Sequence, residues 1–251
     1  MSSLNPAQGF SDPSQLYPQQ LSQWDQQRAD AMRLYQAGHH SQFLELARAN
    51  LRSARALQNA TREGAALNDL GLAYLSCHQP QQALEFLHQA LESAQISRQT
   101  KTTAVTLSNL GSAYSQLGQL LYAKGLLKRA LILFQRAQDL AGEVSTLHQL
   151  ALLYTQMDEP KRALLIHHQV LARRRLLGDF SGEAVTLNGL GLVHHALNQP
   201  EQALSCFQEA LKIQRATRNL AGEATTLNNL AAVYTELGQP QQSLITYHQI
   251  L

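Results

Sequence analysis

The side chains best suited to chemistry in this sequence are amides that recur at a fixed spacing. One position, repeated every 40 residues, is occupied by Asn68, Ser108, His148, Asn188 and Asn228. The next position is occupied by Asp69, Asn109, Gln149, Gly189 and Asn229. An Asn side chain carries both a donor and an acceptor, so it can pair with the N–H and C=O groups of an extended peptide. The pattern therefore predicts recognition of a peptide.

Histidines are the residues that most suggest a metal. They form three adjacent pairs, His39-His40, His167-His168 and His194-His195. Zinc needs three or four converging ligands, and neighbouring residues on a helix point to different faces. We therefore predict no metal site and no cofactor. If His148 and His195 both face a ligand, binding should respond to pH near their ordinary pKa of about 6.5.

Motifs for catalysis are absent from the sequence. There is no Gly-rich phosphate loop, no nucleophile elbow and no pair of carboxylates in a catalytic arrangement. The one dense basic run, Arg173-Arg174-Arg175, falls late in a predicted helix, where cations suit the helix dipole. The net charge is +2, which argues against a nucleic-acid or membrane-surface partner. We predict that the chain is not an enzyme.

Composition favours a helical protein of the cytoplasm. The apolar share of 44% can fill a continuous core. Cys77 and Cys206 lie more than three repeats apart, too far for a disulfide in a linear stack, so we expect free thiols in a reducing compartment. The N-terminus lacks a signal peptide, and no apolar run approaches the roughly 18 residues of a membrane span.

The elements that position the amides can be read from residues 187–226. One helical face is indicated by the spacing of Leu187, Leu190, Gly191 and His194, and a second by the spacing of Ala203, Phe207, Ala210 and Leu211. Residues 198–200 interrupt the two, and Pro200 suits the first turn of the second helix. Residues 218–222 are expected to form the next turn, and Glu223 to open the following helix. Each unit is therefore an antiparallel pair, helix A then helix B.

Small residues recur where these helices must approach closely. On helix A they are Gly71, Gly111, Ala151, Gly191 and Ala231; on helix B they are Ala83, Ala123, Ala163, Ala203 and Ser243. A Gly inside a helix is unfavourable by about 1 kcal/mol relative to Ala, so its recurrence at one position indicates a packing requirement.

Five copies of the unit begin at Leu67, Leu107, Leu147, Leu187 and Leu227, without insertion or deletion. The pattern Leu-x-x-Leu-Gly-x-x-Tyr, best seen in residues 227–240, resembles the tetratricopeptide repeat, with a period longer than the usual 34 residues. It is similar to the repeats of kinesin light chain and of bacterial signalling scaffolds. We predict an all-α, right-handed superhelical solenoid over residues 19–251, after a flexible tail of residues 1–18 and a helix start near Pro18. The repeats would be a degenerate copy at 27–66, then 67–106, 107–146, 147–186, 187–226 and a partial copy at 227–251.

The resemblance implies that A helices line a concave groove that binds a peptide or protein segment. In similar scaffolds the Asn residues of the Leu-Asn-Asn-Leu motif hold the peptide backbone, which carries over to Asn109 and Asn229, and approximately to Asp69 and Gln149. The full predicted site is Asn68, Asp69, Ser108, Asn109, Ser112, His148, Gln149, Leu152, Asn188, Leu192, His195, Asn228, Asn229 and Thr235. Related co-chaperones clamp an acidic tail with Lys and Arg, and the Asn and Ser found here disfavour that ligand.

The last helix raises three alternatives. Leu244, Tyr247, Ile250 and Leu251 would form an apolar face that a repeat array normally covers. Either the chain is a piece of a longer protein, or this face pairs with another subunit, or the exposure of this face is tolerated. A rival function follows from the first alternative, because similar repeats precede protease-like or DNA-binding effector domains in bacteria. The second makes the chain a self-assembling module.

Overall fold

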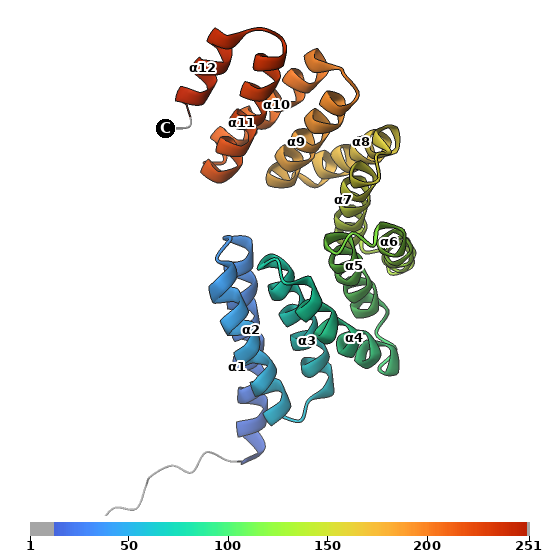
Figure 1. Cartoon of the computed structure of the whole chain (residues 1–251). Coiled ribbons are helices and arrows are strands. Elements are labelled where there is room, and N and C mark those ends of the chain that lie inside the picture. The colour runs from blue at the N-terminus through green and yellow to red at the C-terminus, as the bar shows by residue number, and fades with distance from the viewer. Residues whose placement is uncertain (1–12, 250–251) are drawn as a thin grey trace, which may run out of the picture. The chain divides into compact units, whose positions relative to one another are not determined.

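The computed structural model describes residues 13–249, which form twelve α-helices connected by short turns (Figure 1). Their bounds are α1 Pro13–Gln36, α2 His40–Ala56, α3 Ala60–Ser76, α4 Pro80–Ile96, α5 Thr100–Gln116, α6 Leu120–Arg136, α7 Leu140–Gln156, α8 Pro160–Leu177, α9 Phe180–Ala196, α10 Pro200–Ala216, α11 Leu220–Glu236 and α12 Pro240–His248. The odd-numbered helices are the A helices and the even-numbered ones the B helices. The chain divides into two compact units, unit 1 (residues 1–117, α1–α5) and unit 2 (residues 118–251, α6–α12).

The 40-residue period has a simple local origin. A typical A or B helix has 17 residues, as in α3 and α4, and each is followed by a turn of three residues. Four B helices begin with a proline in the first turn, as predicted from Pro200: α4, α8, α10 and α12. A proline at this position gives up no helical hydrogen bond, because the first N–H groups of a helix have no partner inside it.

Every turn contains a residue in the left-handed conformation, and these residues are spaced 20 apart. Only four of them are glycine, Gly38, Gly118, Gly178 and Gly238. The others are Gln58, His78, Arg98, Gln138, Asp158, Asn198 and Arg218, with φ between 50° and 58°. At ten of these turns the backbone ends a helix in the same way; for example, Gln79 N–H donates to the carbonyl of Tyr74 over 2.9 Å. The turn geometry is therefore set by the closing of the helix pair rather than by glycine.

Two predicted boundaries were wrong. The first helix begins at Pro13 rather than near Pro18, because Pro13 suits a first helical position equally well and comes earlier. The rest of the predicted tail, residues 1–12, lies outside the described residues. The turn expected at 218–222 is shorter, because α11 already begins at Leu220. Asn219 caps that helix: its side-chain oxygen accepts from Gly222 N–H over 3.0 Å.

Close packing between A and B helices explains the recurrent small residues. A Cβ placed on Gly71 would lie 2.5 Å from Cδ2 of Leu87, and one on Gly191 would collide with the ring of Phe207. On the B helices Ala83, Ala123, Ala163 and Ala203 are fully buried. The packing role predicted for these positions is confirmed.

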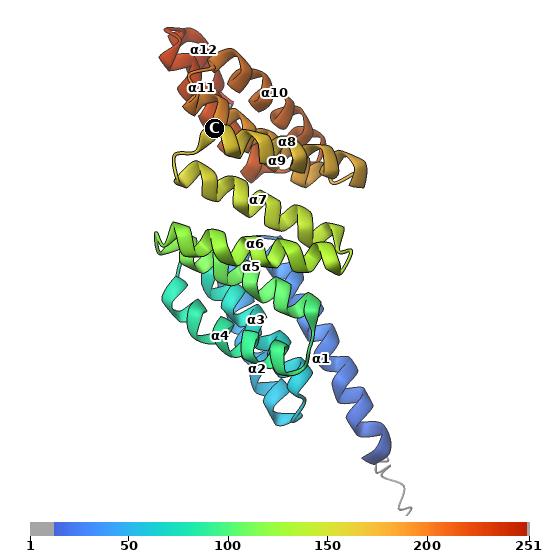
Figure 2. The same ribbon diagram turned by 90° about the vertical axis from the view of Figure 1, so that its right-hand side faces the viewer.

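Each unit has its own core. In unit 1, Trp24, Phe43, Leu67 and Leu70 belong to one buried cluster that draws on α1 to α4. In unit 2, smaller clusters lie between successive helices, as where Phe207 of α10 packs with Leu230 and Val233 of α11. Figure 2 shows α6 and α7 of unit 2 beside each other, as their contacts require. None of the helices within residues 13–249 combines the length and apolarity needed to cross a membrane.

Candidate peptide-binding site

The predicted amides lie on A helices that contact one another within each unit. α3 contacts α5 in unit 1, and α9 contacts both α7 and α11 in unit 2. Side chains at corresponding positions of successive A helices therefore come close together. The closest pairs are 41 residues apart in sequence, so that the second residue of one motif faces the first residue of the preceding motif.

In unit 1 the predicted binding groups Asn68, Asp69 and Asn109 form hydrogen bonds between neighbouring A helices. Asn109 Nδ2 donates to Asn68 Oδ1 over 3.1 Å. Asp69 accepts two bonds from the Arg28 guanidinium, at 2.5 and 3.1 Å, and these hydrogen bonds raise the pKa of Arg28. Asn68, Asp69 and Asn109 are buried, as is Ser108. The expectation that these four side chains offer free polar groups on a groove surface is wrong, because all four are buried and three of them bond to a neighbouring A helix.

The A helices of unit 2 are more open. Leu152 of α7 is 44% exposed and Leu192 of α9 is 42% exposed. Asn228 and Thr235 of α11 are exposed as well, although the hydroxyl of Thr235 donates to its own helix at Ala231. Val185 of α9, which the sequence did not single out, is 45% exposed. Its spacing of seven residues from Leu192, two helical turns, is the signal that would have found it.

Other predicted residues of unit 2 combine partial exposure with bonds between helices. Asn229 Nδ2 donates to Asn188 Oδ1 over 3.0 Å, the same pairing as in unit 1 but half-buried rather than buried. His195 Nε2 and Glu236 Oε2 lie 2.6 Å apart across α9 and α11. Gln149 is half-buried, and so is Ser112 of unit 1. These groups line the A-helix face without being wholly free.

His148 differs from the other members of its series. It is half-buried, and burial together with the positive charge of Arg174 lowers its pKa to about 3. The prediction that His148 titrates near its ordinary pKa is therefore wrong, because the ring is withdrawn from water. The residue 41 positions further on, where the paired amides Asn109 and Asn229 stand in other repeats, is Gly189, which has no side chain with which to pair.

The Arg run has a structural explanation more specific than the helix dipole. Arg173 pairs with Glu143 of α7 at 3.1 Å, and Arg175 pairs with Glu183 of α9 at 2.6 Å. Arg174 is mostly buried and donates to Thr186 Oγ1 over 2.8 Å. The three guanidinium groups hold α8 against its neighbours.

Within residues 13–249, no cluster of three or more His, Cys, Asp or Glu could bind a metal ion. Cys77 and Cys206 are half-buried free thiols.

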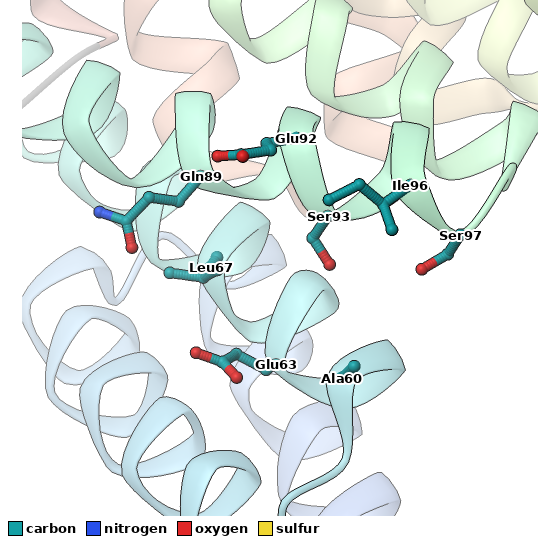
Figure 3. Close-up of a pocket in the computed structure, with 8 residues that line it drawn as sticks. All are labelled: Ala60, Glu63, Leu67, Gln89, Glu92, Ser93, Ile96 and Ser97. Carbon is teal, nitrogen blue, oxygen red and sulfur yellow. The ribbon is translucent and has the colours of Figure 1, made fainter.

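A cavity of about 350 Å³ lies elsewhere, between α3 and α4 of unit 1 (Figure 3). Glu63 and Leu67 line it from α3, and Gln89, Glu92 and Ile96 line it from α4. None of the fourteen predicted site residues belongs to its wall. The cavity is therefore a separate feature of one helix pair and not part of the A-helix face.

Stacked antiparallel helix pairs with polar and apolar groups along their A helices define a class of repeat proteins that act as interaction scaffolds. The model of the tetratricopeptide repeat family matches residues 62–143, 102–176, 143–216 and 182–251. The chain belongs to this family, as its motif predicted.

Several solved structures share the fold of this chain. The crystal structure of BtubC (BKLC) from P. vanneervenii is 21% identical, with a TM-score of 0.67 over 90% of this chain and 89% of that one. A kinesin light chain structure with nearly identical TPR-like repeats from Podosopora anserina is 20% identical, with a TM-score of 0.61 over 74% of this chain and 92% of that one. NprR in complex with its cognate peptide NprX is 16% identical, with a TM-score of 0.72 over 96% and 68%. No curated protein matches the sequence.

Proposed function

We propose that unit 2 binds an extended peptide or protein segment along the face formed by α7, α9 and α11. The observation that carries the proposal is the mixture of exposed side chains there. Leu152, Val185 and Leu192 are apolar and 42–45% exposed, and Asn228 and Thr235 add polar groups on the adjacent helix. Apolar contacts would supply affinity, at about 25 cal/mol per Å² buried, and the amides would fix the peptide backbone.

The proposed site keeps the predicted residues of unit 2 except His148, whose ring is withdrawn from water, and adds Val185. It consists of Gln149, Leu152, Val185, Asn188, Leu192, His195, Asn228, Asn229 and Thr235. Asn228 is the most available amide, because it is exposed while Asn188 and Asn229 bond to each other. Helix pairs already packed in this arrangement would order a ligand at little entropic cost to themselves.

The comparison with NprR supports the kind of ligand. That protein was crystallised with a peptide, and its fold matches 96% of this chain. At 16% identity the likeness carries over the scaffold and not the contacts. We assign binding to this chain and no catalysis, since a scaffold works by holding its partner.

The test is a selection of random peptides displayed on phage against the full chain, followed by calorimetry with the enriched peptide. Leu192→Asp should weaken binding by at least tenfold, because it places a charge in the apolar part of the face. The control is Leu165→Asp, which changes a leucine on the B helix α8 that is even more exposed, at 62%, and should leave affinity unchanged. Asn228→Ala should lower affinity several-fold at an unchanged thermal midpoint. Equal effects of the two leucine variants would refute the site.

A second candidate is self-association through α12. Its outer face exposes Leu244 and Tyr247, and Tyr247 is 44% exposed where its counterpart Phe207 is fully buried under α11. Leu251, also predicted to contribute, lies outside the described residues. If copies pair through this face, the mass measured by light scattering should rise with concentration and Leu244→Glu should abolish the rise. A constant mass for the unsubstituted chain would exclude this candidate.

A further inference from the structure

Helix α8 buries polar side chains at two positions where most of the other B helices bury apolar ones. His167 is 0% exposed and occupies the position held elsewhere by Leu87, Leu127 and Phe207. Arg174, also largely withdrawn from solvent, occupies the position held by Ala94, Phe134 and Gln214. Burying polar groups is unfavourable unless they find partners, so the space between α7, α8 and α9 differs in kind from the other helix contacts of unit 2.

Two imidazoles meet in this space. The ring of His167 lies edge-on to the ring of His148 from α7, with centroids 5.8 Å apart. From α9 the backbone of Gly189 closes over His167: a Cβ on Gly189 would lie 2.6 Å from His167 Cε1. The imidazole of the B helix therefore fills the place that an Asn side chain takes at residues 109 and 229. We call these contacts of His148, His167, Arg174 and Gly189 the histidine seam.

The seam leaves polar atoms without partners. His148 Nδ1, both ring nitrogens of His167 and Arg174 Nε are buried and make no hydrogen bond. The charged groups around them offer no compensation to a protonated imidazole. Arg174 repels it from α8, and His168 on the same helix adds to the repulsion. The nearby carboxylates are engaged with arginines: Glu143 with Arg173, Asp179 with Arg174 and Glu183 with Arg175.

The closed seam therefore holds both rings neutral. Burial, reinforced by Arg174, lowers the pKa of His148 to about 3 and that of His167 to about 4. When the seam opens to water, each ring regains an ordinary pKa of about 6.5. Because the opened state binds more protons between these values, the stability of the closed state is complete at neutral pH and falls as the pH drops below about 6.5.

We propose that the histidine seam is an acid-sensitive latch that keeps α7, α8 and α9 packed at neutral pH and releases them in mildly acidic solution. Opening would separate Leu152 on α7 from Val185 and Leu192 on α9, so a peptide held there would be released. That last consequence rests on the proposed function, whereas the opening itself does not. At pH 5.0 each exposed imidazole multiplies the opening equilibrium by about 30, and two multiply it by about 10³.

The test is hydrogen–deuterium exchange of the full chain at pH 7.5 and pH 5.0, corrected for the intrinsic effect of pH on exchange. Peptides from residues 160–196 should show an opening equilibrium larger by up to about 10³-fold at pH 5.0. Peptides from α3 and α4 of unit 1 serve as the internal control, because that unit contains carboxylate–arginine pairs such as Arg55–Glu63 but no buried histidine pair among its described residues. An equal response in both units would overturn the proposal.

The chain supplies the matched variants. His167→Leu installs the residue found at positions 87 and 127, and His148→Asn installs the residue found at 188. Each should reduce the pH effect to about 30-fold, and the double variant should abolish it. A full pH effect in the folded double variant would refute the latch. With a selected peptide, binding lost at pH 5.0 by the parent chain and kept by the double variant would link the latch to ligand release. Failure to select any peptide would count against the proposed function and leave the exchange result standing.

Discussion

The two units fill the contacts between successive A helices with different residues. In unit 1, polar side chains meet as complete pairs, Arg28 with Asp69 and Asn68 with Asn109. In unit 2, Asn188 and Asn229 repeat this pairing, but His148 faces Gly189 and the space is filled from α8 by His167. The repeated backbone thus determines which positions come into contact. The residues of each repeat determine whether that contact is a hydrogen bond, an ion pair or an imidazole without a hydrogen bond.

The difference has consequences for both stability and binding. Buried, paired amides stabilise unit 1 and are not available to a ligand. In unit 2 the amide pair is half-buried, apolar residues such as Leu152 and Leu192 are exposed, and the histidine seam leaves ring nitrogens unpaired. The proposed ligand binding and the proposed sensitivity to pH therefore fall in the same unit.

The largest expected effect on stability comes from introducing into the histidine seam the Asn residue that unit 1 has at the corresponding position. Gly189→Asn restores the amide found at 109 and 229, yet its Cβ would collide with His167, so unfolding of unit 2 should become easier by about 2 kcal/mol. The double variant Gly189→Asn with His167→Leu reproduces the combination of Leu87 and Asn109 and should recover most of the loss. Urea titration of the three chains measures both changes. A single variant as stable as the parent would show that the seam is not tightly packed.

A smaller effect is expected from deleting one amide in each unit. Asn109→Ala leaves the carbonyl oxygen of Asn68 buried without its donor and should cost about 1–3 kcal/mol. Asn229→Ala leaves Asn188, which water and Thr226 can still reach, and should cost about 0.5–1 kcal/mol. Amide exchange of α5 and of α11 in the two variants compares the losses. A loss in unit 2 that matches or exceeds the one in unit 1 would contradict the distinction between buried and half-buried pairs.

The smallest effect concerns a feature that the units share. Gln58 in unit 1 and Gln138 in unit 2 adopt left-handed backbone angles, with φ of 50° and 52°. Gly at either position removes the strain of a side chain there but adds freedom to the unfolded chain, so we expect a net gain of about 0.5 kcal/mol. Thermal unfolding of Gln58→Gly and Gln138→Gly should show similar gains. Clearly different gains would mean that the turns, too, differ between the units.

Local patterns in the sequence predicted most of the fold. The 40-residue repeat, the prolines at the start of B helices and the small residues such as Gly71 and Ala83 led to helix pairs that the structure confirms. The errors occurred where local signals competed. Pro13 and Pro18 both suit a helix start, and Asn219 reads equally as a turn residue or as the cap that it forms.

The candidate site was only partly predictable. The sequence placed the predicted residues on the A helices, where the structure has them, but it treated Asn68, Asp69, Ser108 and Asn109 as surface groups, although they are buried. It read His167 through its position in a pair of adjacent histidines, although the informative neighbours are His148 and Gly189, which lie on other helices. No local pattern contains that information, because each helix contributes one residue to the contact.

The sequence by itself determined that paired helices stack at a constant interval, because the spacing of apolar, small and turn-forming residues acts within a few residues of the chain. Tertiary structure alone decided which amides remain open to a partner and which imidazoles become partly or wholly buried. Those outcomes depend on side chains about 20 or 41 residues apart that meet only after the helices pack, as Asn109 meets Asn68 and His148 meets His167.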